Sequence, residues 1–181
     1  SSRVAIKVDN VQKDTKNSKD PSQKCNNLIS CCWNVRSFVN KIKFKDIFDN
    51  IKKHASNQLS LPIKETCNKI FFIALVETWE KLNEMNDTFS VIGFKRYAIQ
   101  RSEKRGGGIS LYINNSIQSF LLNQHICDDF ELIAVTCLIE RIKYLVVAVY
   151  RIPNGNIVNF LSNVADICDN YDNVILTGDI N

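Results

Sequence analysis

Polar side chains stand at the ends of four apolar stretches of the sequence. The stretch "ISCCWN" ends in Asn34, "IFFIALVE" ends in Glu77, and "YLVVAVY" ends in Tyr150. A fourth stretch, "VILTGDIN", carries Asp179 and Asn181. If these stretches are strands, the groups at their carboxyl ends meet at one rim, where open α/β sheets bind their ligands.

These groups suit a hard divalent cation. Mg²⁺ prefers carboxylate and amide oxygens, and it keeps several waters and room for a phosphate oxygen. Glu77 is the clearest candidate, because a carboxylate that follows seven apolar residues is costly to bury without a cation, a donor or water. Taken alone, however, Glu77 is better explained as a solvated strand end. Asp179 and Asn181 lie two apart and would share one side of an extended chain, but "GDIN" is also common in turns.

A second candidate for phosphate chemistry is the glycine run 106–108, which follows a basic stretch. The run matches neither of the two glycine-rich nucleotide-binding patterns, so we interpret it as a tight turn into the strand "ISLYI". Arg101, Lys104 and Arg105 beside that turn could contact DNA phosphates, which requires only charge and reach. A solvated loop explains these three residues equally well.

Composition limits the class of protein. The chain has 181 residues, of which 45% are apolar and 23% charged, as in one soluble globular domain. A net charge of +4 permits a polyanionic partner without requiring one. Seven cysteines without a C-x-x-C pair favour reduced thiols in an intracellular protein over a zinc site or disulfides. No apolar run approaches the roughly 20 residues of a membrane span, so we expect no membrane association.

The elements that position the polar groups follow from hydrophobic spacing. Residues 1–24 are polar and are predicted to form a flexible tail, so that the folded domain covers 25–181. A helix is predicted within 37–55 and a strand buried on both faces over 70–76. Between them a loop is predicted over 54–69, because the segment has no clear period and contains Pro62. The helix would bury one stripe, formed by Phe44, Ile47, Phe48 and Ile51.

The second half of the chain is richer in strands. Two strands are predicted within 89–101 and 108–113, followed by a hairpin over 130–154. A helix follows, and a last short strand ends at Gly178. That helix would carry an apolar stripe of Ile157, Phe160, Leu161, Val164, Ala165 and Cys168. The order of elements predicts a layered α/β domain whose sheets are covered by helices.

Six stretches, taken together and in order, resemble the endonuclease/exonuclease/phosphatase family. They are "SCCWNVRS", "FIALVETW", "RGGGISLYI", "FELIAVTCLI", "VVAVYRIPN" and "VILTGDIN", and the resemblance covers about residues 26–181. The pieces "ETW", "RGGGISLYI" and "YRIPN" most resemble the endonuclease domains of non-LTR (LINE-type) retrotransposons. In those elements the domain precedes a reverse transcriptase in one long polyprotein.

The resemblance implies a four-layer α/β sandwich of the deoxyribonuclease type and hydrolysis of a DNA phosphodiester with Mg²⁺, or with Mn²⁺ in its place. Glu77 would be the main metal ligand, helped by Asn34, and Tyr150 would hydrogen-bond the scissile phosphate. Asp179 would orient or deprotonate the attacking water, and Asn181 would hold that water or a phosphate oxygen. The product would be a nick with a free 3′-hydroxyl, which a reverse transcriptase can extend, and the protein of an active element would be nuclear.

The sequence departs from the family pattern in two places. The segment 54–69 is longer than expected. Family members also continue beyond "GDxN" to a second aspartate and a Ser-Asp-His ending, and neither His54 nor His125 stands at a matching position. We therefore expect the N-terminal two-thirds of a domain, incomplete at its C-terminus, with weak or absent activity, an open sheet edge and an uncovered apolar face.

Two alternatives stay open. The chain could be a degenerate retroelement remnant without catalysis, although such a copy would be expected to have lost some of the five polar residues. It could also be a phosphoesterase of the same fold that acts on an abasic site, an inositol phosphate or a sphingolipid, since fold alone does not decide the substrate.

Overall fold

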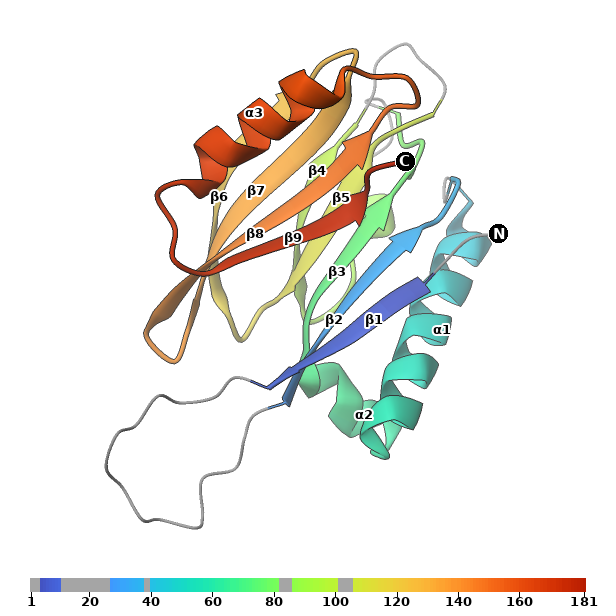
Figure 1. Ribbon diagram of the computed structural model, residues 1–181. Coiled ribbons are helices and arrows are strands. Elements are labelled where there is room, and N and C mark those ends of the chain that lie inside the picture. The colour runs from blue at the N-terminus through green and yellow to red at the C-terminus, as the bar shows by residue number, and fades with distance from the viewer. Residues whose placement is uncertain (1–3, 11–26, 38–39, 82–85, 101–105) are drawn as a thin grey trace, which may run out of the picture.

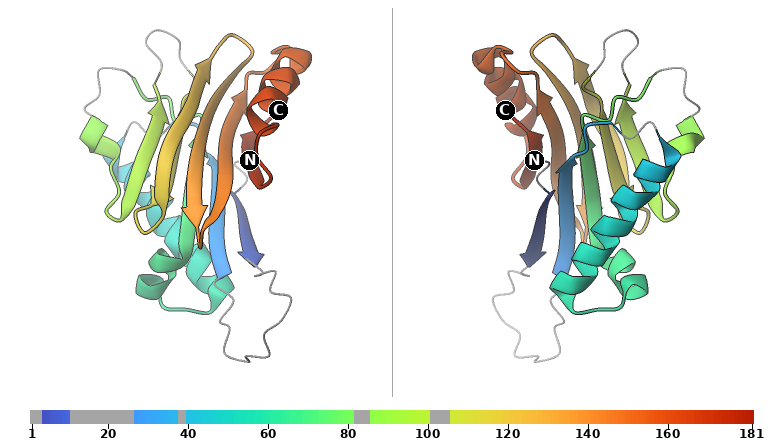
Figure 2. Two further views of the ribbon diagram at one scale, coloured as in Figure 1. Left: turned by 90° about the vertical axis from the view of Figure 1, so that its left-hand side faces the viewer. Right: turned by 90° about the vertical axis from the view of Figure 1, so that its right-hand side faces the viewer.

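Two β-sheets pack face to face at the centre of the molecule (Figures 1 and 2). This computed structural model describes residues 4–10, 27–37, 40–81, 86–100 and 106–181. The first sheet has the order β1-β2-β3-β5-β4 and the second has the order β6-β7-β8-β9. The first sheet comprises β1 (Val4–Asn10), β2 (Asn27–Asn34), β3 (Ile70–Val76), β4 (Phe94–Ile99) and β5 (Ile109–Asn114). The second comprises β6 (Gln118–Ile126), β7 (Phe130–Ile139), β8 (Ile142–Arg151) and β9 (Val174–Asp179).

Helices cover the outer faces of both sheets, which gives four layers (Figure 2). The predicted four-layer α/β sandwich is therefore confirmed. On the first sheet lies α1 (Lys41–Leu59), and on the second lies α3 (Ile157–Cys168). The short helices are α2 (Ile63–Thr66), η1 (Cys67–Lys69) and η2 (Asn86–Phe89). No helix in the described part of the chain has the length and apolar character needed to span a membrane.

The core between the sheets is almost entirely aliphatic and aromatic. Every residue of β3 is buried, as its unbroken apolar sequence predicted, because the second sheet covers one face and α1 the other. Burial raises the pKa of the Cys31 and Cys137 thiols to about 12. The cysteines in the described ranges are free thiols.

The helix α1 buries the predicted stripe of Phe44, Ile47, Phe48 and Ile51. Its N-cap is Asn40, whose side-chain oxygen accepts a hydrogen bond from the Ile42 N–H at 2.8 Å. The predicted loop over 54–69 is wrong, because α1 continues to Leu59 and α2 with η1 fills most of the rest. Pro62, which suggested a loop, directly precedes α2, where the missing N–H of proline costs nothing.

The predicted flexible tail is corrected at residues 4–10. These residues form β1, which pairs antiparallel with β2 from Val4 opposite Trp33 to Asn10 opposite Asn27. The sequence "VAIKVDN" alternates bulky apolar residues with others, a strand pattern that the polar composition of the surrounding stretch outweighed. The folded part therefore begins before residue 25, and residues 11–24 lie outside the described ranges.

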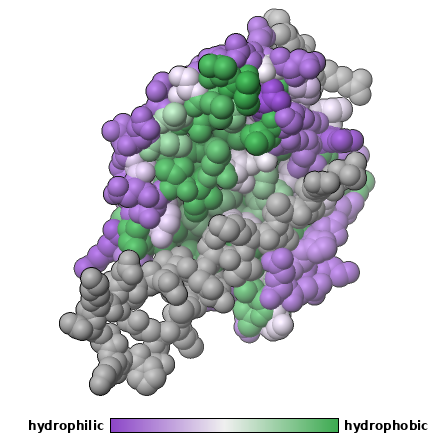
Figure 3. Space-filling view, viewed as in Figure 1, coloured by the Kyte–Doolittle hydropathy of each residue, from purple (hydrophilic) through white to green (hydrophobic). Residues whose placement is uncertain are grey.

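The predicted hairpin in the second sheet is confirmed as β7 and β8, joined by Glu140 and Arg141 in left-handed conformations. The stripe predicted for α3 is only partly buried, because Phe160 and Val164 contact the sheet whereas Ile157 and Leu161 are 46% and 56% exposed. The residues Ile157, Val158, Leu161, Val174 and Leu176 give α3 and the edge strand β9 an exposed apolar face (Figure 3). Such a face was expected from the sequence.

Candidate active site

Three of the predicted residues meet at one rim of the sandwich. Asn34 ends β2, Glu77 follows β3 and Asp179 ends β9, and the pairs β2–β3 and β8–β9 are both parallel. The Asn34 Nδ2 group donates to Glu77 Oε1 at 2.9 Å and to Asp179 Oδ2 at 2.7 Å. One amide thus joins two carboxylates that come from different sheets.

The backbone around Glu77 is held in an unusual conformation. Glu77 has a φ of 56° and Trp79 a φ of 57°, a region that residues other than glycine rarely occupy. The Glu77 carbonyl accepts from the Ser37 N–H at 2.6 Å. On the other side, Thr78 N–H donates to Gly108 O at 3.2 Å and Trp79 N–H to Gly107 O at 2.9 Å. Strained residues of this kind persist where their surroundings over-determine them, which is common at functional sites.

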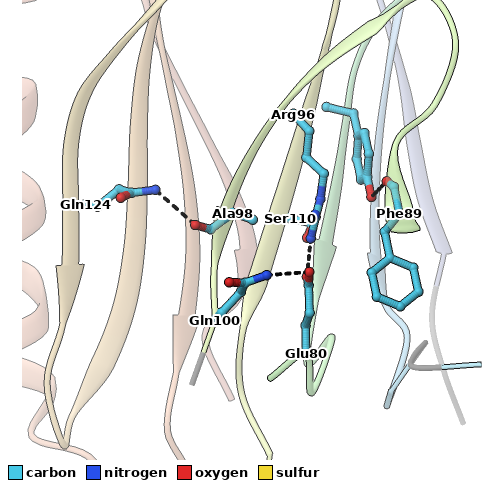
Figure 4. A network of polar contacts seen from close by, with 8 residues as sticks. Glu80, Phe89, Arg96, Ala98, Gln100, Ser110 and Gln124 are labelled. Atoms are coloured by element: carbon cyan, nitrogen blue, oxygen red, sulfur yellow. Dashed lines mark hydrogen bonds and ion pairs between the residues drawn. The ribbon is translucent and has the colours of Figure 1, made fainter. Parts of the chain in front are cut away.

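A buried polar network fixes the chain just beyond this turn (Figure 4). The Glu80 carboxylate is 1% exposed, pairs with the Arg96 guanidinium and accepts from Gln100 Nε2 at 2.6 Å. Arg96 also donates to Ser110 Oγ at 2.9 Å. These partners lie on or beside β4 and β5, so the segment that follows Glu77 is tied to the far side of the first sheet.

Tyr150 approaches Glu77 from the second sheet. Its strand places it opposite Glu131 on β7 and opposite Asp179 on β9, so the three side chains lie in one row. Burial is the main cause that raises the pKa of Tyr150 to about 12, followed by the charge of Glu77 and a hydrogen bond with it, and then by Glu131 and Asp179. The phenol therefore keeps its proton near neutral pH.

Asn181 is arranged differently from the other four. Its backbone N–H donates to Asp179 Oδ1 at 3.0 Å, while its side-chain amide donates to the Arg151 carbonyl. The Arg151 guanidinium in turn donates to the carbonyls of Ile180 and Asn181, each at 2.6 Å, and to that of Gly155 at 2.9 Å. Arg151 thus holds the segment that carries Asp179 and Asn181 through hydrogen bonds to its carbonyl groups.

The donor set at this rim fits Mg²⁺ or Mn²⁺. Glu77 and Asp179 supply carboxylate oxygens of the hard type that Mg²⁺ binds, whereas Asn34 turns its Nδ2 group toward both carboxylates and its Oδ1 toward the Arg36 N–H. Within the described ranges, no group of three His, Cys, Asp or Glu side chains forms a ready-made cage. Mg²⁺ usually binds through one or two carboxylates and keeps several waters, so the Glu77 and Asp179 carboxylates satisfy its requirements.

Positive charge borders the site on the first sheet. Arg36 and Lys43 are exposed, and Lys43 Nζ donates to the Arg36 carbonyl at 3.0 Å. The Arg36 N–H donates to Asn34 Oδ1 at 3.2 Å, which fixes the orientation of the Asn34 amide. The predicted DNA contacts Arg101, Lys104 and Arg105 lie outside the described residues.

Two glycines let neighbouring segments pack closely around the site. One of them, Gly108, lies in the tight turn into β5 that the sequence predicted. Gly108 has a φ of 86°, and a Cβ at this position would meet Thr78 Oγ1 at 2.5 Å. Gly178 has a φ of 139°, and a Cβ there would overlap the Val149 carbonyl of the neighbouring strand. Sequence reasoning did not single out Glu131 or Arg151. Glu131 carried a signal, since it is a carboxylate inside the apolar run "FELIAV".

Comparisons with known proteins identify the fold. No family model and no curated protein sequence matches the chain. Among solved structures, an endonuclease/exonuclease/phosphatase family protein from Bacteroides thetaiotaomicron is 11% identical, with a TM-score of 0.54 over 85% of this chain and 63% of that one. A humanized D. rerio TDP2 is 13% identical, with a TM-score of 0.52 over 85% of this chain and 66% of that one.

The endonuclease domain of TRAS1, a telomere-specific non-LTR retrotransposon, is 12% identical over 68% of this chain and 52% of that one. Its TM-score of 0.46 is too low to support an argument. The first two likenesses show that the chain has the endonuclease/exonuclease/phosphatase fold, which confirms the resemblance at the level of fold. The chain spans between 52% and 66% of the lengths of these three structures.

Proposed function

We propose that the chain carries the site of a Mg²⁺-dependent phosphodiesterase that nicks DNA, with Asn34, Glu77, Tyr150, Asp179 and Asn181 as the catalytic residues, and that its own cleavage is weak or absent. The observation that carries the proposal is the Asn34 amide, which hydrogen-bonds at once to the Glu77 and Asp179 carboxylates. Two carboxylates held this close repel each other unless a donor or a cation lies nearby. Fold and residues therefore point to the same rim.

Glu77 would hold the metal ion, with Asp179 adjacent, and Asn34 would help by orienting both carboxylates through its Nδ2 group. When bound, Mg²⁺ supplies positive charge that offsets the charge growing on the phosphate and on the leaving oxygen. The Glu77 turn needs no large rearrangement to present its carboxylate, because hydrogen bonds to Ser37, Gly107 and Gly108 already hold the turn.

The remaining residues would act on water and phosphate. Asp179 orients a water and accepts its proton as the water oxygen bonds to phosphorus. The bond from phosphorus to the 3′ oxygen breaks, the phosphate stays on the 5′ oxygen, and the 3′ oxygen takes a proton from solvent water and leaves as a 3′-hydroxyl. Tyr150, protonated at neutral pH, donates a hydrogen bond to the phosphate as its charge rises. Asn181 would hold the water or a phosphate oxygen after its amide leaves the Arg151 carbonyl.

DNA is the substrate that best fits the surroundings. Arg36 and Lys43 place exposed positive charge at the rim, where a phosphate backbone would lie. The stretches "ETW", "RGGGISLYI" and "YRIPN" support a retrotransposon endonuclease in particular. Its nick would prime a reverse transcriptase in the same polyprotein, inside the nucleus.

A metal-binding and cleavage experiment tests the proposal. Mn²⁺ binding is measured by electron paramagnetic resonance for the wild-type chain, for Glu77→Ala and for Glu65→Gln, an exposed control in α2. We expect binding in the wild type and the control and its loss in Glu77→Ala. The same three proteins are then incubated with supercoiled plasmid and Mg²⁺, and a polymerase must extend the resulting nick if it carries a 3′-hydroxyl.

The alternatives give different outcomes. Equal Mn²⁺ binding by wild type and Glu77→Ala would contradict the metal site. Mn²⁺ binding without plasmid cleavage, together with hydrolysis of an abasic duplex, an inositol phosphate or sphingomyelin, would assign the chain to another phosphoesterase activity. Mn²⁺ binding with no hydrolysis of any of these substrates would favour the non-catalytic remnant.

A further inference from the structure

Glu131 is a carboxyl group buried at the centre of the site. It lies on β7 at 0% exposure, in the row with Tyr150 and Asp179 on the face that packs against the first sheet. A carboxyl group without access to water is costly to fold into a core unless hydrogen bonds compensate it. Such a residue is therefore expected to have a specific partner.

That partner is the backbone of the glycine run. The Gly108 N–H donates to Glu131 Oε2 at 2.6 Å, a bond that joins the second sheet to the start of β5 in the first. Gly108 itself has no room for a side chain, since a Cβ would meet Thr78 Oγ1 at 2.5 Å and Ile99 O at 3.3 Å. Glu131 and Thr78 thus lie on two sides of one glycine.

The same glycine run controls the Glu77 turn. The carbonyls of Gly107 and Gly108 accept from the N–H groups of Trp79 and Thr78, the two residues that follow Glu77. These bonds support the left-handed conformation that Glu77 and Trp79 share. A shift of Gly108 would therefore move this turn and change the direction in which the Glu77 side chain points.

We propose that Glu131 is a positioning residue, which holds Gly108 and through it the turn that aims Glu77 at Asn34. The inference rests on the proposed metal site but adds a residue that the mechanism does not use. Groups that orient metal ligands in this way typically change metal affinity by about 10- to 100-fold when they are removed.

The test compares Mn²⁺ affinity in wild type, Glu131→Leu and Glu131→Gln. Leucine removes the acceptor, so we expect Mn²⁺ binding to weaken by about 10- to 100-fold. Glutamine keeps an acceptor oxygen at similar size, so we expect a value within about threefold of wild type. The Gly108 amide resonance in a nitrogen-edited NMR spectrum should move in both variants, because its acceptor changes.

Two further pairs separate positioning from general damage. Gly108→Ala should reproduce the loss, whereas Gly93→Ala should not, because Gly93 has nearly the same φ of 89° but nothing within 4 Å of the added Cβ. Ser119→Ala removes another buried bond between the sheets, the one to Tyr97 at 2.9 Å. It should lower the unfolding midpoint without changing Mn²⁺ affinity. If Glu131→Leu does not fold, Glu131→Gln and Gly108→Ala still decide the question.

The outcomes are distinct. No Mn²⁺ binding by the wild type would contradict the proposed metal site itself. Wild-type binding that is unchanged in folded Glu131→Leu, or in Gly108→Ala, would overturn the positioning role alone. So would a loss in Glu131→Gln as large as that in Glu131→Leu, because the acceptor oxygen would then not be what matters.

Discussion

The two carboxylates of the site, Glu77 and Asp179, are held by strands with very different surroundings. Glu77 follows β3, which is buried along its whole length and has β2 and β5 as neighbours. Asp179 ends β9, which is alternately half-buried and exposed and, among the described strands, pairs with β8 alone at the edge of its sheet. The first half of the site is thus built by the core, whereas the second half depends on a few local contacts.

The local contacts on the Asp179 side can be named. Gly178 lets β9 approach the Val149 carbonyl, and Arg151 binds the carbonyls of Ile180 and Asn181. Each replaces support that the Glu77 side receives from two neighbouring strands and the Glu80–Arg96 ion pair. Changes on the two sides should therefore have different consequences, for chemistry on one and for local stability on the other.

The largest effect should come from the charge of Glu77. Glu77→Gln keeps the size of the side chain but removes the charge that binds a cation. We expect a loss of Mn²⁺ affinity that exceeds the ~100-fold upper range of indirect partners, with little change in the unfolding midpoint. Asp179→Asn, measured in parallel by the same titration, should lose less, because its support is weaker. A larger loss in Asp179→Asn would reverse the comparison.

Gly178→Ala should destabilise the second sheet. The new Cβ would overlap the Val149 backbone carbonyl, which cannot move without breaking the β8–β9 pairing. We expect a cost of about 1–3 kcal/mol in denaturant unfolding, the usual range for overpacking. The matched change Gly93→Ala adds a methyl group in open space and should cost only the roughly 1–2 kcal/mol of its left-handed backbone conformation, which Gly178→Ala carries in addition to the overlap. Equal costs for Gly178→Ala and Gly93→Ala would show that β9 moves away from β8 at little cost in free energy.

Arg151→Met should loosen the Asp179 side selectively. Methionine keeps part of the aliphatic stem and loses the three hydrogen bonds to carbonyl groups. Each is partly or fully exposed to solvent, so a net cost near 1 kcal/mol is expected. Hydrogen exchange should accelerate in β9 and stay unchanged in β3. Uniform acceleration in both strands would mean that Arg151 supports the whole domain rather than this segment.

The smallest effect concerns Asp129, which holds the start of α3. Hydrogen bonds from the Asn156 N–H and from the Asn159 side chain lower the pKa of its carboxyl group. Because the folded-state pKa is depressed, this contribution is fully present above the ordinary value and is lost as the pH falls below about 4. The stability difference between wild type and Asp129→Asn should therefore shrink in acid. A difference that is constant with pH would exclude the carboxylate as its cause.

The sequence by itself determined the layered architecture and the positions of most elements. The unbroken run of β3, the helical stripe of α1 and the β7–β8 pair are set by local spacing, so they could be predicted without tertiary information. The five polar strand ends were visible for the same reason. Composition misled the prediction at residues 4–10, where an edge strand forms in a polar stretch, and Pro62 misled it at α2.

Only the tertiary structure decided which groups touch. The Asn34 amide binds Glu77 and Asp179, which lie 43 and 145 positions further along the sequence. The Glu131–Gly108 hydrogen bond joins residues that are 23 positions apart. No local period encodes such separations, because they depend on how two sheets pack and on which strand ends share a rim. The left-handed turn at Glu77 also needed the fold, since its conformation is imposed by Ser37 and the glycine run and not by its own residue type.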